Sequence, residues 1–351
     1  MTTKTRYFVI VSLLVLTVGL GTGLVAYYVG LPTSAFANRG GPDELQYVPH
    51  DAAVLAYANV QDVMASDLRR HVKDAMPMSE NGQREFQDHT GINIETDIDH
   101  VVACLDADAG VSGPHSGMVV ATGRFDVARI ESLMREHGAQ VEEYKGVRLL
   151  VGSGRAMRSR TGDTGSSDSS MARPSGSDDN FALAFLKPGI IAVGSAPLVH
   201  RAVDLKDGGD NVTTNDEVMA LVRSLDSGNN AWALGHFDAL RSKAKLPESV
   251  ASQIPAITLF SVSARIDGGL HGTLRADTRD DEAANNLRDV VRGFLALGKM
   301  QTASRPEMQA MMESLELGGT GKTVALSFAV PAELFDTIHS RTHKAPGPHG
   351  R

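Results

Sequence analysis

The run that most resembles a chemical motif is Gly-Gly-Thr-Gly-Lys-Thr at 318–323. A phosphate-binding loop needs Gly-x-x-x-x-Gly-Lys-Thr between a strand and a helix. Counting back from Gly321, Glu316 stands where the first glycine belongs, and the apolar residues after Thr323 are typical of a strand. No helix N-terminus would then face a phosphate. We therefore expect a glycine-rich turn before a strand, with Lys322 pointing to solvent.

Two further patterns suggest metal binding but lack parts of the required ligand set. His339 and His343 are four residues apart and could share a helix face, but the Pro/Gly-rich tail follows without an acidic partner. The segment 106–110 begins like a calcium loop. Val111 stands where the sharp turn needs glycine, and Gly117 where the bidentate glutamate belongs. We predict a solvated tail and a surface turn, with no metal site.

The candidate nucleophiles have equally simple structural explanations. Ser153 matches part of a Gly-x-Ser-x-Gly elbow, but a polar segment follows it instead of the required helix. Cys104 is the one cysteine and lies in an apolar run, so it is interpreted as a small buried hydrophobe. A single cysteine excludes an intramolecular disulfide and a multi-cysteine zinc site. Asp280 and Asp281 are interpreted as helix-start residues. No catalytic, cofactor-binding or metal-ligating residue is assigned, and an enzyme is left open without being favoured.

Composition narrows the class of protein. The chain has 351 residues, a formal net charge of −8, 42% hydrophobic residues and 5% aromatic residues. The apolar content is enough for the cores of one to three domains. A general nucleic-acid binder needs a basic surface, so no nucleic-acid partner is expected.

The strongest signal is an uncharged run of 25 residues from Tyr7 to Leu31. About 20 helical residues cross the hydrocarbon core of a bilayer. Lys4 and Arg6 precede the run, and basic residues favour the cytoplasmic side. The sequence predicts a cytoplasmic tip and transmembrane helix at 1–31, a linker at 32–46, and an extracytoplasmic remainder in the cell membrane of a bacterial envelope.

The alternative is a cleaved signal peptide. Ala35-Phe36-Ala37 is a small-x-small cleavage site, with cleavage after Ala37. The apolar part of a signal peptide usually has about 7–15 residues, so the longer run favours a signal-anchor. Both interpretations export the rest of the chain.

The body repeats one local pattern, in which a short apolar strand leads into a helix. Asp126 and Asp280 are expected to start two of these helices, because aspartate is a favoured N-cap. The apolar residues after Asp280 recur with helical spacing and predict one buried face; they are Leu287, Val290, Val291, Phe294 and Leu295. The predicted strands are 53–59, 118–124, 231–236, 272–277 and 323–328.

Hairpin signals lie between these units. Turns are expected at 145–146, 188–189 and 267–268, where glycine follows Lys, Pro or Asp. Hairpins mixed with helices predict an α+β fold, with antiparallel sheets and helices packed on one face. The methionine stripe at 308–312 is expected to be core.

The recurring pattern predicts two related halves, 47–226 and 227–340. Residues 153–180 are rich in Ser, Gly and Asp and are expected to be a disordered insertion in a hairpin. Residues 341–351 are expected to be a disordered tail.

Two segments resemble an uncharacterised group of bacterial single-span envelope proteins that carry a domain of unknown function. They are Tyr47-Val48-Pro49-His50-Asp51-Ala52-Ala53 and Thr90-Gly91-Ile92-Asn93-Ile94-Glu95-Thr96-Asp97-Ile98. The resemblance implies membrane attachment and a non-catalytic character, and it brings no activity or site residues that could be transferred to this chain.

These observations favour a membrane-anchored extracytoplasmic protein with a non-catalytic binding or scaffolding role. Its partners would be the membrane, through residues 7–31, and an unknown envelope protein or ligand. Two alternatives stay open: an envelope hydrolase with a site dispersed over His, Asp and Ser residues, and a carrier of an apolar ligand. Convergent titratable groups in a cleft would favour the hydrolase, and a large apolar cavity the carrier.

Overall fold

The computed structural model describes most of the chain beyond the predicted membrane segment. The described residues are 41–69, 87–88, 91–106, 117–136, 138–153, 180–237, 256–302 and 306–331. The predicted span at 7–31 and the tail at 341–351 lie outside them. In the part that is described, no helix has the length and apolar character needed to cross a membrane. These residues form two compact units, unit 1 (56–69 and 225–331) and unit 2 (41–55 and 87–224).

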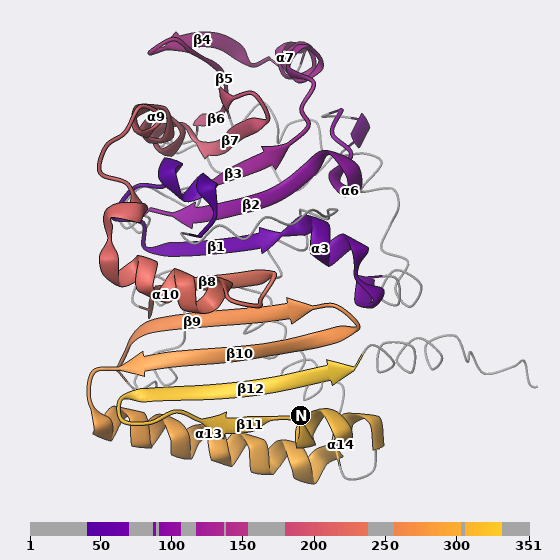
Figure 1. The fold of residues 1–351 in the computed structure, drawn as a ribbon, viewed down its shortest axis with the longest axis vertical. Coiled ribbons are helices and arrows are strands. Elements are labelled where there is room, and N and C mark those ends of the chain that lie inside the picture. The colour runs from indigo at the N-terminus through magenta and orange to yellow at the C-terminus, as the bar shows by residue number, and fades with distance from the viewer. Residues whose placement is uncertain are drawn as a thin grey trace, which may run out of the picture. The chain divides into compact units, whose positions relative to one another are not determined.

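Unit 2 is built on six antiparallel strands in the order β2-β3-β7-β6-β5-β4. The strands are β2 (Ile98–Leu105), β3 (Gly117–Gly123), β4 (Gln140–Tyr144), β5 (Val147–Ser153), β6 (Asn180–Lys187) and β7 (Ile190–Ser195). The chain leaves β3 through a helix, forms the β4–β7 meander, and returns so that β7 pairs with β3 (Figure 1). The expected turn at 145–146 is present, with positive φ at Lys145 and Gly146.

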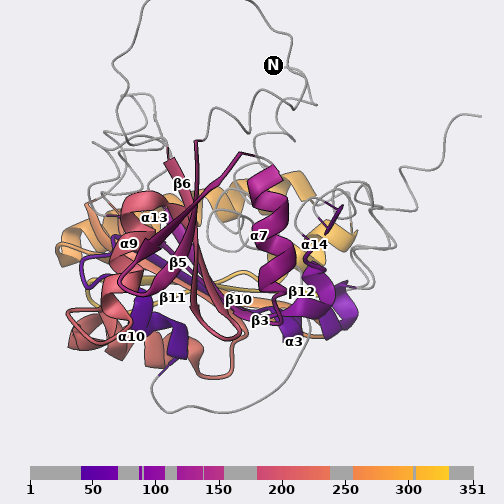
Figure 2. The same ribbon diagram turned by 90° about the horizontal axis from the view of Figure 1, so that it is seen from above.

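The helices of unit 2 cover both faces of these strands. They are η2 (Asp43–Tyr47), α6 (Ile94–Asp97), α7 (Val127–Glu136), α9 (Ala196–Leu205), η4 (Val212–Thr214) and α10 (Asp216–Asp226). The division between units falls inside the last turn of α10. Figure 2 shows α7 and α9 on opposite sides of β5 and β6. The predicted packing on one face is therefore wrong for this unit. Consecutive residues Ala182, Leu183 and Ala184 of β6 are all buried, which requires cover on both faces.

The folded part of unit 2 begins earlier than predicted. The expected linker extended to residue 46, but Glu44 and Leu45 of η2 are buried. The insertion predicted at 153–180 falls between the β5 and β6 strands, whose ends Ser153 and Asn180 pair with each other. The residues between them lie outside the described part of the chain.

Unit 1 is a second antiparallel arrangement, in the order β8-β9-β10-β12-β11. The strands are β8 (Ala231–His236), β9 (Ile257–Ile266), β10 (Gly269–Thr278), β11 (Glu316–Gly318) and β12 (Thr323–Pro331). The strand β1 (Val54–Asn59) neighbours β8, and the division between units falls inside it. The ring of Tyr57 stacks on Trp232 at 5.6 Å, and the Asn59 amide donates to the Asn230 carbonyl. Residues 56–69 therefore belong with the second half of the chain, unlike the predicted division after residue 226.

The helices of unit 1 are α3 (Val60–Ala65), α13 (Asp281–Thr302) and α14 (Pro306–Glu313). The Asp280 carboxylate caps α13 by accepting from the Ala283 amide at 2.8 Å, and Asp126 caps α7 in the same way. α13 packs along β10, β12 and β11 (Figure 1). Antiparallel strands and helices thus make an α+β fold, as predicted. The predicted buried face of α13 is wrong in part, because Val290 and Phe294 are exposed.

Candidate functional site

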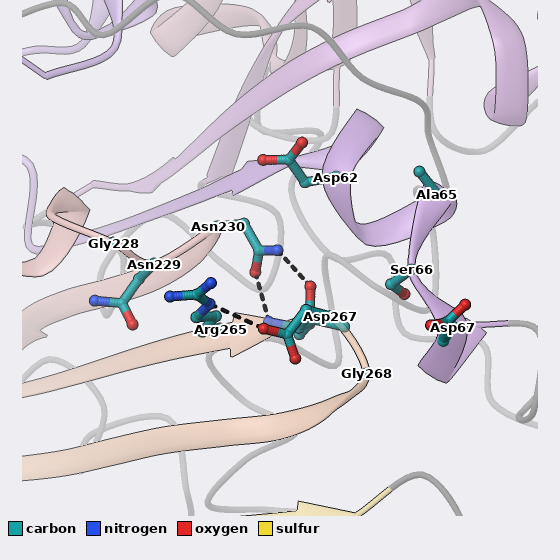
Figure 3. A pocket seen from close by; sticks show the side chains of 11 residues that line it. Asp62, Ala65, Ser66, Asp67, Gly228, Asn229, Asn230, Arg265, Asp267 and Gly268 are labelled. Carbon is teal, nitrogen blue, oxygen red and sulfur yellow. Dashed lines mark hydrogen bonds and ion pairs between the residues drawn. The ribbon is translucent and has the colours of Figure 1, made fainter.

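One depression lies in unit 1 and has a volume of about 570 Å³. It lies where the end of α3, the segment before β8 and the β9–β10 turn come together (Figure 3). Its lining is mostly polar: Asp62, Ala65, Ser66, Asp67, Gly228, Asn229, Asn230, Arg265, Ile266, Asp267 and Gly268. Both sequence halves contribute to it, because residues 56–69 belong to unit 1.

Asn230 fixes the β9–β10 turn at the edge of this depression. Its Nδ2 donates to the Ile266 carbonyl at 2.6 Å, and its Oδ1 accepts from the Ile266 amide at 2.9 Å. The Leu68 amide donates to the Asp267 carbonyl at 3.1 Å from the other side. The turn is therefore held by contacts to two other segments, so the depression is preformed.

The charges of the depression are also fixed. Arg265 Nε donates to Asp267 Oδ2 at 2.9 Å. Desolvation raises the pKa of Asp267, but the hydrogen bonds from Arg265 and the Gly268 and Gly269 amides outweigh it and hold the pKa below its ordinary value. Asp267 is therefore a stable carboxylate and is unsuited to donate a proton near neutral pH.

The remaining polar groups do not form a reacting set. Ser66 Oγ donates to the Val63 carbonyl at 2.5 Å and accepts from the Arg69 amide at 3.2 Å. No histidine lines the depression. Figure 3 shows Asp62 and Asp67 at separate places on the α3 side. In the described part of the chain, no group of three His, Cys, Asp or Glu side chains is placed to hold a metal ion. The arrangement can bind, but it offers no nucleophile with an adjacent base.

A second cluster, in unit 2, contains a carboxylate, a histidine and a hydroxyl. Thr122 Oγ1 donates to Glu44 Oε1 at 2.5 Å, and His100 Nδ1 lies 3.7 Å from the same oxygen. Burial raises the pKa of Glu44, but His100, Thr122 and the backbone amide together hold it below its ordinary value. In a hydrolase triad the hydroxyl bonds to the imidazole, which takes its proton. Here the hydroxyl bonds to the carboxylate, so the cluster holds a buried charge and does not activate Thr122.

A smaller depression of about 360 Å³ lies in unit 2 beside α7 and β4. Its lining residues are Val127, Val141, Glu143, Gly146, Arg148 and Phe185. Val127 and Val141 are exposed, and Phe185 is half-buried. Three apolar side chains therefore line this small hollow. Its volume is at the lower end of the range for small-molecule sites.

The glycine-rich run has the structure that the sequence predicts. Gly319 and Gly321 have positive φ, at 91° and 56°. The strand β12 begins at Thr323, no helix follows the run, and Lys322 is exposed. The run is therefore a turn and no phosphate loop.

Cys104 also follows its prediction. It lies within β2 and is buried, and burial raises the pKa of its thiol to about 12. A thiol of this kind carries almost no thiolate at neutral pH and is inert.

Two other candidates from the sequence, Ser153 and Asp106, lie in unit 2. Ser153 ends β5, and Asp106 pairs with Arg201 at 3.9 Å. His339, His343 and the rest of the calcium-like segment lie outside the described residues. The sequence reasoning missed Asn230 and Arg265. The turn predicted at 267–268 indicates one wall of the unit 1 depression, because its signal is local. The contact of Asn230 with Ile266 joins residues 36 positions apart, so no local pattern predicts it.

Comparisons with known proteins add little. No family model matches the chain, and no curated protein matches it. Among solved structures, the chain is similar to one titled "Structure of crystal form I of TP0453", with a TM-score of 0.42 and 10% identity. The match covers 87% of this chain and 99% of that one. A TM-score this low supports no inference, so the fold rests on the elements described above.

Proposed function

We propose that the protein is a membrane-anchored extracytoplasmic protein with a non-catalytic binding or scaffolding role. The observation that carries the proposal is the depression of unit 1, which is preformed, charged and without a nucleophile–base pair. Preorganised polar groups favour binding because they need little ordering when a partner arrives. The membrane part of the proposal rests on the apolar run at 7–31 and on Lys4 and Arg6 before it.

The lining indicates the chemistry of the partner. Arg265, the arginine of the lining, is already paired with Asp267. Asp62 also lines the depression, where a lysine, arginine or amide of a partner can reach its carboxylate. We infer a polar segment of an envelope protein with basic side chains as the occupant.

Site-specific photo-crosslinking in the intact envelope tests this proposal. A photoreactive residue in place of Ala65, which lines the depression and is exposed, should give a discrete adduct. Asp62→Asn should reduce the yield severalfold. The matched control is a photoreactive residue at Glu142, an exposed position on β4 of unit 2.

The same experiment has clear contradicting outcomes. Equal adducts from Ala65 and Glu142, or an Ala65 adduct whose yield is unchanged by Asp62→Asn, would count against binding at this depression. Turnover of an ester or phosphoester by the purified chain, lost in His100→Gln, would establish the hydrolase alternative instead.

The unit 2 depression is the observation that favours the carrier alternative, because the apolar side chains of Val127, Val141 and Phe185 line it. A fluorescent apolar probe would support a carrier if it binds the chain and its affinity falls in Val141→Glu but not in Glu142→Gln. Absence of saturable probe binding would count against it.

A further inference from the structure

Helix α13 exposes a second apolar stripe in addition to the face that packs on the strands. Val290, Phe294, Leu297 and Met300 are 43%, 61%, 55% and 77% exposed. They make up four of the six exposed large hydrophobic residues in the described part of the chain. A surface helix normally directs its apolar residues to the core. An exposed stripe of this size marks an interaction surface.

The spacing of the stripe is that of a helix–helix seam. Asn286, Val290, Gly293, Leu297 and Met300 follow one another at intervals of four and three. These are the a and d positions of a heptad repeat. The other face of α13 holds Ala284, Leu287, Val291 and Leu295, which are buried or half-buried. The seam is therefore separate from the packing of α13 within unit 1.

Gly293 leaves open space on the helix surface that a closely approaching partner can use. A Cβ added at Gly293 would meet nothing within 4 Å, so no contact among the described residues requires glycine there. Glycine in an exposed helix interior costs about 1 kcal/mol relative to alanine. In an antiparallel pair, a positions of one helix pack against d positions of the other. Centred on the stripe, this places Leu297 of one copy against Gly293 of the other, and Val290 against Met300.

The charges beside the stripe favour the antiparallel direction. Asp281, Glu282 and Asp289 lie in the first half of α13, and Arg292 and Lys299 in the second half. Arg288 donates to the Gly321 and Thr323 carbonyls and is used within the unit. Asp289 pairs with Arg292 of its own helix at 2.9 Å, and antiparallel pairing also brings it within a turn of Lys299 of the other helix. A parallel pair would place like charges side by side.

We propose that a second copy of this chain occupies the α13 stripe, and that two α13 helices pair antiparallel about a two-fold axis near its centre. Such an axis makes the interface self-complementary. A helix of 22 residues is about 33 Å long. One helix pair buries less than the roughly 1,200 Å² typical of stable complexes, so the pair has low affinity. Tethering in one membrane would strengthen it through effective concentration. That last step rests on the proposed anchoring, whereas the pairing itself does not.

Cysteine pairing in the full-length chain, purified in mild detergent, tests the direction. Val290→Cys and Met300→Cys proteins with different tags are mixed and mildly oxidised. Mixed dimers should exceed both self-dimers at least fivefold, because 290 faces 300 of the other copy. Cys104 does not interfere because it is buried. Glu316→Cys, at an exposed position on β11, is the matched control and should not crosslink.

Gly293→Leu separates pairing from folding. The leucine fills the space that Leu297 of the second copy would enter, so the dimer dissociation constant from sedimentation should rise at least tenfold. Melting of the monomer should stay equal or increase, since leucine favours helix. Leu297→Glu should weaken the dimer as well.

Three results would overturn the proposal. The first is a monomer at about 100 µM in which Val290→Cys and Met300→Cys crosslink no more than the control. The second is a monomer whose flotation with anionic vesicles is lost in Leu297→Glu, which would make the occupant a lipid surface. The third is an intramolecular disulfide between Phe294→Cys and Phe335→Cys, which would assign the stripe to the chain's own C-terminal segment.

Discussion

Glu44 is a buried carboxylate whose charge is stabilised by specific partners. Thr122 donates to it at 2.5 Å, and His100 lies 3.7 Å away. Desolvation alone would raise its pKa, but these partners hold the pKa below the ordinary value of 4.5. A depressed pKa in the folded state means that the ionised form favours folding.

The stability of unit 2 should therefore depend on pH through Glu44. Its contribution is fully present above the unfolded value of 4.5 and is lost as pH falls through the lower folded value. Glu44→Gln should lower the free energy of unfolding by about 1–3 kcal/mol at pH 7 and flatten its acid dependence. Urea unfolding between pH 3 and 7 measures both effects. Glu136→Gln, an exposed control on α7 of the same unit, should leave the curve unchanged, and an unchanged curve for Glu44→Gln would refute this account.

The turn before β12 gives a second test at the residue scale. A side chain at Gly319 would collide with the Thr323 carbonyl and would require a positive φ of 91°. Gly319→Val should therefore lower the free energy of unfolding by about 1–3 kcal/mol or more. Lys322→Ala, at the neighbouring exposed position, should stay within about 0.5 kcal/mol. Thermal melting compares the two, and saturable ATP binding lost in Lys322→Ala would reopen the nucleotide-binding reading.

Local chemistry explains which residues were predictable. Gly319, Gly321 and the caps Asp126 and Asp280 act on neighbouring backbone, so their types and positions are sufficient signals. The bonds between Asn230 and Ile266 depend on the fold that brings β8 and β9 together, and no spacing rule encodes them. The candidate site is therefore much less predictable than its flanking turn.

At the scale of elements, strands and hairpins follow the sequence more closely than helix packing does. β8 has the predicted bounds, 231–236, because an apolar run and polar neighbours delimit it. α9 and α10 are absent from the predicted elements, although Pro197 in the first turn of α9 is a typical helix start. Packing on one face failed as a prediction because burial on both sides of β6 depends on which strands become central.

The β5–β6 insertion gives a test at this scale. Ser153 pairs with Asn180, so an Asn-Gly turn can replace residues 154–179 and continue the ladder. Each halving of a flexible loop lowers its closure cost by only about 0.6 kcal/mol. The melting temperature of the shortened chain should not fall. A decrease worth several kcal/mol would show that the removed segment packs on unit 2.

At the scale of the whole molecule, the two units share an order of elements. A hairpin leads into a helix, and a later strand returns to pair with the second strand of the hairpin: β2–β3, α7 and β7 in unit 2, and β9–β10, α13 and β12 in unit 1. We propose that the two halves are related, as the sequence pattern predicts, and the shared order of elements supports this proposal. Unit 2 contains the additional hairpin β4–β5.

Cysteine accessibility combined with membrane extraction tests export and anchoring most directly. Glu316→Cys places a reactive thiol on an exposed strand, while the buried Cys104, with its pKa near 12, stays silent. A maleimide that cannot cross the cytoplasmic membrane should label this variant in intact cells, and the labelled chain should remain in the membrane after alkaline carbonate extraction. Labelling only after lysis would contradict export, and a soluble mature protein that begins at Asn38 would contradict the anchor.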